Sequence, residues 1–111
     1  LTQFKITGYF KELDINIIPE SFALHPNYPN PFNPITRIRY DLPEPVDVYL
    51  DVYNILGRHV ITLFNDYQEA GQYSVVWDGR DKLGISLSSG VYFVRISAGN
   101  HVRSNKILLL K

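Results

Sequence analysis

Residues 36 to 53 read TRIRYDLPEPVDVYLDVY, and their apolar side chains recur at every second position. Ile38 and Tyr40 alternate with charged residues, and beyond two prolines Val48 and Leu50 continue the alternation. A period of about two residues places the apolar side chains on one face of a strand, whereas a helix needs a period near ~3.6. The stretch therefore predicts two half-buried β-strands joined by a proline-containing turn.

Similar runs continue downstream, separated by turns. The predicted strands lie at residues 60–64, 73–77, 91–96 and 102–110, and residues 65–72 and 81–90 are predicted loops. The turn after the second strand contains Gly57, which we expect to supply a positive φ. Six short strands with hairpin-type turns and no helical period predict an all-β fold, an immunoglobulin-like antiparallel β-sandwich of about seven strands.

A proline-rich segment precedes these strands. Five of the seven prolines of the chain lie within residues 19–34, where they exclude a helix and disfavour a central strand. The segment also holds Phe22, Leu24, Tyr28 and Phe32, whereas a free linker seldom carries so many large apolar groups. We expect an extended segment that these side chains pin to the sandwich, and it is a candidate for the seventh strand.

The sequence divides into a sandwich at residues 22–111 and a leading part at residues 1–21. The leading part holds two short β-like runs, which predict a linker or the trailing strand of an upstream domain. Extra edge strands of the sandwich are the alternative. Because the chain begins with Leu1 and shows no signal peptide, we interpret it as a fragment of a longer precursor.

Composition excludes several classes of function. Lys plus Arg and Asp plus Glu both number 11, which argues against nucleic acid or an anionic membrane as the main partner. The chain has no cysteine, so a disulfide scaffold, a zinc–thiolate site and a cysteine nucleophile are excluded. The apolar run at residues 107–110 is too short to cross a bilayer, and no membrane-spanning segment is predicted.

No group of residues has the spacing of a catalytic or metal site. The histidines His25, His59 and His101 stand far apart, and we expect solvated surface side chains. The loop from Asp78 to Gly90 lacks the ligand order of a calcium loop, although a structural calcium there is an open alternative. We predict no catalytic residue, no metal site and no cofactor.

Trp77 has two interpretations. A tryptophan at a strand end can be a platform for sugars, or it can fill the gap between two sheets. It ends a run with Tyr73 and Val75 on one face, which favours the core. The residues expected to be buried are Ile38, Tyr40, Leu50, Val52, Val75, Trp77, Tyr92 and Val94.

The last strand is the candidate for recognition by a partner. Both of its faces carry apolar side chains near the end, more than a strand with one buried face needs. An edge strand with surplus apolar surface can pair with another chain, although burial of both faces would explain the same pattern. The candidate recognition residues are Lys106, Ile107, Leu108, Leu109, Leu110 and Lys111.

Several short motifs stand in a fixed order across residues 22–111. Their residues are Tyr28, Pro29, Asn30, Pro31, Phe32, Asn33, Pro34, Gly57, Trp77, Asp78, Gly79, Gly90 and Tyr92, followed by the closing segment 106–111. This series closely resembles the type A C-terminal sorting domain of the type IX (Por) secretion system. It is also similar to the immunoglobulin-like domain of flagellar hook-capping proteins, which lack the full proline-rich opening. Asn54 stands where the sorting family more often has Asp.

The resemblance implies a non-catalytic role in protein export. A sorting domain directs a cargo domain fused to its N-terminal side through the periplasm to the outer-membrane translocon, for release or for surface anchoring by a sortase. The implied partners are therefore components of the translocon and the sortase. The alternative is an accessory carbohydrate-binding or spacer sandwich that stays on a mature secreted enzyme. An exposed row of aromatic residues would favour that alternative, whereas a buried Trp77 and an ordered last strand would favour sorting.

Overall fold

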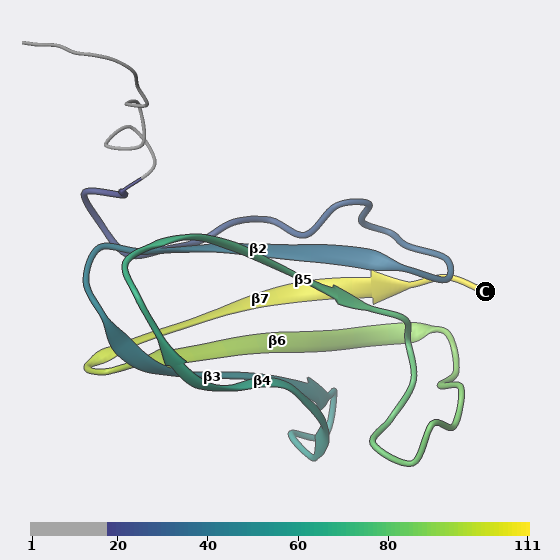
Figure 1. The fold of residues 1–111 in the computed structure, drawn as a ribbon. Coiled ribbons are helices and arrows are strands. Elements are labelled where there is room, and N and C mark those ends of the chain that lie inside the picture. The colour runs from purple at the N-terminus through teal and green to yellow at the C-terminus, as the bar shows by residue number, and fades with distance from the viewer. Residues whose placement is uncertain (1–17) are drawn as a thin grey trace, which may run out of the picture.

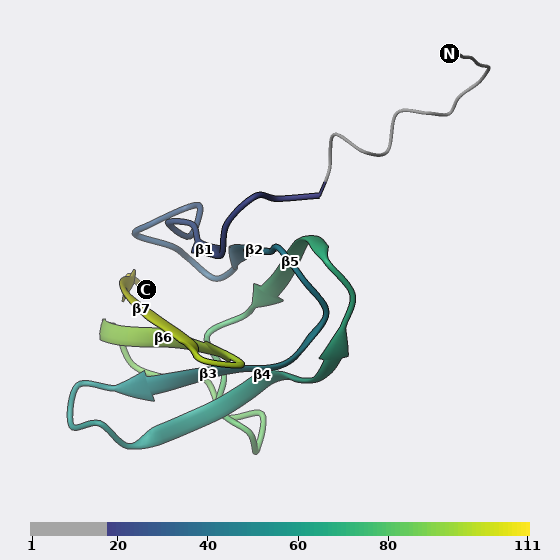
Figure 2. The ribbon, with the colours of Figure 1, turned by 90° about the vertical axis from the view of Figure 1, so that its left-hand side faces the viewer.

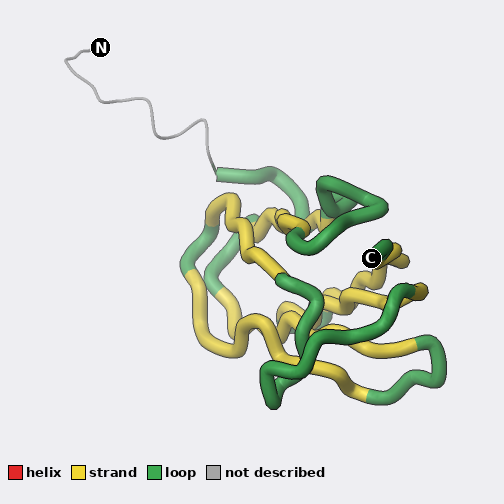
Figure 3. The backbone as a smooth tube through the Cα atoms, turned by 90° about the vertical axis from the view of Figure 1, so that its right-hand side faces the viewer, coloured by secondary structure: helices red, strands yellow, loops and turns green. Residues whose placement is uncertain are grey.

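The structure is a computed structural model that describes residues 18–111. Its strands are β1 (Ala23–Leu24), β2 (Thr36–Leu42), β3 (Val46–Asn54), β4 (His59–Gln68), β5 (Gly71–Trp77), β6 (Gly90–Ala98) and β7 (His101–Leu109). The described residues contain no helix (Figure 3). The predicted all-β class with seven strands is confirmed. The β-like runs predicted near the start of the chain lie almost entirely outside the described residues.

The strands form two antiparallel sheets. One sheet has the order β1-β2-β5 and the other the order β4-β3-β6-β7. The two sheets lie face to face, with the smaller one above the larger one in Figure 2. Sandwiches arise in this way because each sheet has one apolar face that must be covered.

The core lies between the sheets and follows the alternation in the sequence. Thus Ile38, Tyr40 and Leu42 on β2 are inaccessible to solvent, while Arg37 and Arg39 between them are exposed. Every residue predicted to be buried is buried, with the exception of Val75, which is half-buried. Val75 lies on β5, which is an edge strand of the smaller sheet. The larger sheet covers the Val75 side chain only in part.

Strand β4 is longer than the sequence predicts. Residues 65–72 were expected to be a loop, but β4 continues to Gln68 and β5 begins at Gly71. Asn65, Asp66 and Tyr67 are paired with β3, so cross-strand pairing overrides their weak preference for strands. The prediction of a loop there is wrong for most of its length.

The proline-rich segment is part of the sandwich. It supplies the seventh strand, β1, and it buries Phe22 and Phe32 while Leu24 is half-buried. The expectation that Tyr28 also pins the segment is wrong, because its side chain is 76% exposed. The Tyr28 amide donates to the Arg37 carbonyl at 3.0 Å, and directly paired residues project to the same face of a sheet. Tyr28 therefore shares the outer face with the exposed Arg37.

The sandwich has two ends with different connections, as Figure 1 shows. At the proximal end Phe22 stacks on His101 with ring centroids 4.8 Å apart, next to the turn at residues 43–45. The distal end carries the turn between β3 and β4, the loop at residues 78–89 and the last two residues of the chain. The proline-rich segment runs from the proximal end toward the distal end.

Candidate functional site

The candidate recognition residues lie at the end of β7, which is an edge strand of the larger sheet. Their side chains alternate between the core and the surface. Ile107 and Leu109 are fully buried, Leu108 is half-buried, and Lys106, Leu110 and Lys111 are exposed. Ile107 and Leu109 therefore hold the sandwich together, and the other candidates are the ones that a partner can reach.

The open edge of β7 is closed at its distal end by the proline-rich segment. The Phe32 amide donates to the Leu108 carbonyl at 2.9 Å, and the Leu110 amide donates to the Phe32 carbonyl at 3.0 Å. The Leu108 amide donates to Asn30 Oδ1 at 3.0 Å. These bonds pair the backbone groups that an edge strand would otherwise offer to another chain.

Side-chain hydrogen bonds fix the proline-rich segment in this place. Asn105 on β7 donates from Nδ2 to the His25 carbonyl at 3.1 Å. Asn27 donates to Thr36 Oγ1 at 2.9 Å, and the Thr36 hydroxyl donates to the Pro29 carbonyl at 2.8 Å. Asn27 and Thr36 are both buried. Thr36 stands at the spacing of the sorting family that the sequence resembles, whereas no pattern in the sequence pointed to Asn27. Together these bonds connect β2 to β7 across the side of the sandwich.

Most of the remaining motif residues form the core of the distal end. Trp77 lies between Phe32 and Tyr92, with ring centroids 5.4 and 5.6 Å away. Its indole Nε1 donates to the Arg80 carbonyl at 3.0 Å, and the Tyr92 hydroxyl donates to the Ser88 carbonyl at 2.8 Å. Trp77 is 1% exposed, so it is a core residue and not a platform for sugars.

The two residues after Trp77 form a tight corner. Asp78 Oδ1 accepts a hydrogen bond from the Arg80 amide at 3.2 Å. Gly79 has φ +74°, and a β-carbon there would lie 3.5 Å from Leu109. The left-handed backbone explains the glycine at this position, since the contact of a β-carbon with Leu109 would be an ordinary van der Waals contact. The Trp-Asp-Gly motif thus places the end of β5 against Leu109 of the last strand.

A shallow groove accompanies the candidate residues. It has a volume of about 270 Å³ and is lined by Asn30, Pro31, Val91, Lys106, Ile107 and Leu108. The proline-rich segment forms one wall, and β6 and β7 form the other. The groove could bind an apolar side chain of a partner, because its lining is mostly apolar and includes the Lys106 side chain.

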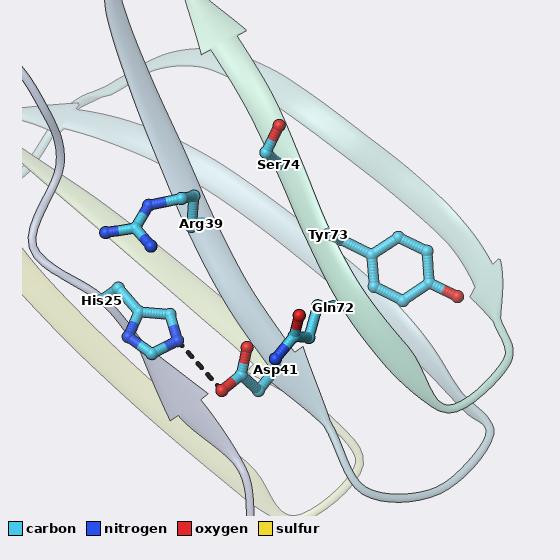
Figure 4. Close-up of a pocket in the computed structure, with 6 residues that line it drawn as sticks. All are labelled: His25, Arg39, Asp41, Gln72, Tyr73 and Ser74. Atoms are coloured by element: carbon cyan, nitrogen blue, oxygen red, sulfur yellow. Dashed lines mark ion pairs between the residues drawn. The ribbon is translucent and has the colours of Figure 1, made fainter. Parts of the chain in front are cut away.

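A polar pocket lies on the outer face of the smaller sheet (Figure 4). Its volume is about 330 Å³, and it is lined by His25, Arg39, Asp41, Gln72, Tyr73 and Ser74. His25 Nε2 lies 2.9 Å from Asp41 Oδ2. The alternation placed Arg39 and Asp41 on this face, but only the pairing of β1 and β5 with β2 brings the side chains of His25, Gln72 and Ser74 to the same face. The Tyr73 ring points away from them and stacks on Tyr40.

His59 is exposed at the surface, as expected, and its ring also belongs to a small hydrogen-bonded group. Its Nε2 lies 3.0 Å from Asp51 Oδ1, and the Thr62 hydroxyl donates to the same oxygen at 2.6 Å. Within residues 18–111 no three acidic or histidine side chains are placed to hold a metal ion. The same residues include no helix that is long and apolar enough to cross a membrane.

Among the titratable groups of residues 18–111, Tyr40 is the one whose pKa the fold clearly shifts. Its side chain is fully buried between the sheets, and its hydroxyl donates to Gln68 Oε1 at 2.7 Å. Burial penalises the phenolate and raises the pKa of Tyr40 to about 12. A neutral tyrosine at every physiological pH is a structural element of the core, not an acid or a base.

A comparison with protein families matches residues 34–101 to the FlgD Ig-like domain. The chain belongs to the FlgD Ig-like domain family. The matched part begins at the last proline of the opening and ends with the first residue of β7, so it contains five of the seven strands, β2 to β6, in full. The expected immunoglobulin-like class is thereby confirmed.

Solved structures with the same fold include FlgD itself. FlgD from Pseudomonas aeruginosa is 25% identical with a TM-score of 0.53, over 67% of this chain and 57% of that chain. The latent dimeric PorU of Porphyromonas gingivalis is 18% identical with a TM-score of 0.62, over 80% of this chain and 9% of that chain. No curated protein sequence matches the chain.

A third structure comes from the type IX secretion system. PorZ of Porphyromonas gingivalis, an essential bacterial surface component of that system, is 19% identical with a TM-score of 0.54. The match covers 80% of this chain and 12% of PorZ. This FlgD Ig-like domain thus spans little more than half the length of FlgD and a small part of PorU and PorZ.

Proposed function

We propose that this FlgD Ig-like domain is a C-terminal sorting domain of the type IX secretion system. It directs a cargo domain fused to its N-terminal side through the outer-membrane translocon, for release or for anchoring by a sortase. It has no catalytic activity of its own. Lys106, Leu108, Leu110 and Lys111 contact the export machinery from the surface, while Ile107 and Leu109 hold the strand in place.

One observation carries this proposal. The segments at residues 22–33 and 102–111 lie outside the FlgD match, and they bind each other through Phe32, Asn30 and Asn105. The two segments that resemble the opening and the closing motif of the sorting family therefore form one unit on one side of the sandwich. A spacer domain has no need for this additional unit, whereas a sorting signal needs a distinctive surface.

The test is export of a reporter fused in front of residues 1–111 in a host with a type IX system. The matched control is the Ig-like domain of Pseudomonas FlgD, which has the same fold. We expect the reporter on the surface or in the medium with this domain, and in the periplasm with the FlgD domain. The same location for both reporters would contradict the proposal.

Point variants separate recognition from folding. A deletion of residues 106–111 would remove the buried Ile107 and Leu109, so loss of export could reflect unfolding. Lys106→Ala and Lys111→Ala change exposed side chains and should reduce export while the melting temperature stays within about 2 °C. Arg103→Ala, on the same strand near the proximal end, is the control and should leave export unchanged.

A carbohydrate-binding module is the second candidate. Tyr49 and Tyr67 lie on adjacent strands of the larger sheet and are 48% and 53% exposed on its outer face. Aromatic rings on a sheet face can stack on sugars. Binding of soluble polysaccharides in affinity electrophoresis, abolished by Tyr49→Ala with Tyr67→Ala, would favour this function over sorting.

A further inference from the structure

The most exposed aliphatic side chains of the described residues are concentrated at the distal end. They are Leu83, Leu56, Ile55 and Ile85, which are 77%, 72%, 71% and 58% exposed. Ile55 and Leu56 lie in the turn between β3 and β4, and Leu83 and Ile85 lie in the loop between β5 and β6. Figure 1 shows both connections at the distal end, and residues of both line one pocket.

Each of the two connections contains a turn, and the two turns have the same pattern of hydrogen bonds. In the first, Asn54 Oδ1 accepts from the amides of Leu56 and Arg58 at 2.9 and 3.0 Å. In the second, Asp81 Oδ1 accepts from the amides of Leu83 and Ile85 at 2.9 and 3.0 Å. We call residues 54–58 and 81–85 the twin turns.

The backbones of the twin turns also correspond. The Gly57 amide donates to the Asn54 carbonyl and the Gly84 amide to the Asp81 carbonyl, both at 2.9 Å. Gly57 and Gly84 have φ values of +80° and +83°. In each turn a leucine precedes the glycine and points into solvent. The backbone, the Asn or Asp side chain and the glycine make the turn, and the leucine contributes nothing to it.

A polar residue would therefore serve the turn better than leucine. Asn, Asp, Gly and Ser dominate turns because they bond to the backbone or accept positive φ. An exposed leucine gains no burial energy in the folded domain, and clustered exposed apolar groups mark interaction sites. Two leucines at equivalent positions in two separate turns thus indicate a surface that another molecule covers.

A pocket between the twin turns completes this surface. Its volume is about 250 Å³, and its lining includes Arg58, His59, Val60, Lys82, Leu83 and Leu87. The Lys82 amide donates to the Val60 carbonyl at 3.2 Å, which holds the two connections together. Among residues 18–111, neither Arg58 nor Lys82 forms an ion pair. The pocket is thus lined by apolar side chains and by two cations without an ion-pair partner, beside Asp81, whose carboxylate accepts backbone amides of its own turn.

We propose that the twin turns and this pocket dock a protein of the export machinery that presents a large apolar side chain next to carboxylates. This inference rests on the sorting function proposed above. The two unpaired cations complement acidic groups, and the concave pocket complements a single side chain. An anionic membrane fits less well, because the chain carries equal numbers of acidic and basic residues and the pocket is concave, whereas a bilayer surface is flat.

The test is the reporter fusion to residues 1–111 carrying Leu56→Asn and Leu83→Asn. Asparagine is close to leucine in size and suits a turn. The matched control carries Val76→Thr and Val102→Thr, which change valines that are 44% and 51% exposed on the strands. We expect export to fall at least about tenfold in the twin-turn variant and to remain unchanged in the control.

Each outcome is decisive. Equal export of the twin-turn variant and the wild-type fusion would overturn the docking surface and leave the sorting function standing. No export of the wild-type fusion would overturn the sorting function, and the docking surface with it. If the asparagine variant melts at a much lower temperature, Arg58→Glu with Lys82→Glu replaces it, with the same expectation.

The membrane is tested separately. Purified wild-type protein is sedimented with vesicles of phosphatidylethanolamine and phosphatidylglycerol. Absence of binding supports a protein partner. Binding that Leu56→Asn and Leu83→Asn abolish would overturn the proposal and assign the surface to a membrane.

Discussion

Trp77 is the centre of the aromatic packing at the distal end, where it contacts Phe32 on one side and Tyr92 on the other. Trp77→Ala should lower the free energy of unfolding by about 3–5 kcal/mol, because it removes a large buried ring and leaves a cavity. Tyr49→Ala, on the exposed outer face, should cost under about 1 kcal/mol. Chemical denaturation of both variants measures the difference. Similar midpoints would mean that Trp77 does not support the core.

Tyr40 makes stability depend on pH in the alkaline range. The pKa of Tyr40 is raised by burial to about 12 in the folded chain, against 10.0 when the side chain is solvated. The folded state therefore holds the proton more tightly, so the stabilisation is complete below pH 10 and is lost as the pH rises to about 12. The full shift corresponds to about 3 kcal/mol.

Denaturation midpoints between pH 8 and pH 12 check this prediction. Tyr40→Phe keeps the ring and removes the hydroxyl, and it should flatten the part of the pH dependence that Tyr40 causes. An identical alkaline decline in both proteins would show that Tyr40 is not responsible.

The proline-rich segment protects the end of β7 at defined atoms. The Leu108 amide is bonded to the Asn30 side chain and the Leu110 amide to the Phe32 backbone. Asn30→Ala should therefore accelerate hydrogen exchange at the Leu108 amide and leave the Leu110 amide slow. Nuclear magnetic resonance measures the two rates in one sample. Unchanged exchange at Leu108 would mean that the segment does not cover the strand.

The loop at residues 78–89 should fold without calcium. Its carboxylates already have partners, since Asp81 Oδ1 accepts two backbone amides and Asp78 Oδ1 accepts one. A calcium site needs several oxygens that converge on one point. We expect the melting temperature to be the same with calcium and with a chelator. A rise of several degrees with calcium, reversed by the chelator, would contradict this.

The regular elements could be predicted from the sequence, while the irregular contacts could not. The alternation of Ile38, Tyr40 and Leu42 reports burial directly, because neighbouring side chains in a strand face opposite ways. By contrast, the bonds of Asn30 and Asn105 to β7 and to the proline-rich segment join residues far apart in the chain. Such contacts have no local pattern, and they closed the edge that was expected to be open.

The sequence identified the candidate site only in part, because the contacts that complete the site also join residues far apart in the chain. The apolar excess at residues 106–111 was visible, but two explanations fitted it equally. The structure divides the residues between them, since Ile107 and Leu109 face the core and Lys106 and Lys111 face solvent. The sequence did not reveal the twin turns. Asn54 and Asp81 are seen to be equivalent only from the hydrogen bonds that their side chains accept from backbone amides.

On the scale of the whole molecule, the start of the described chain and the proposed recognition surfaces lie at opposite ends of the sandwich. The described chain begins at the proximal end, beside Phe22 and the turn at residues 43–45. The twin turns, the groove beside Lys106 and the last residue all lie toward the distal end. A cargo domain attached before Phe22 would thus leave the distal surfaces free for the export machinery.

The central claim is that this domain alone is sufficient to direct a protein through the type IX translocon. The measurement that tests it most directly is the fraction of a reporter, fused before residues 1–111, that reaches the cell surface or the medium in two strains. One strain has an intact translocon, and the other lacks it. We expect most of the reporter to leave the cell in the first strain and to stay in the periplasm in the second. An equal distribution in the two strains would contradict it.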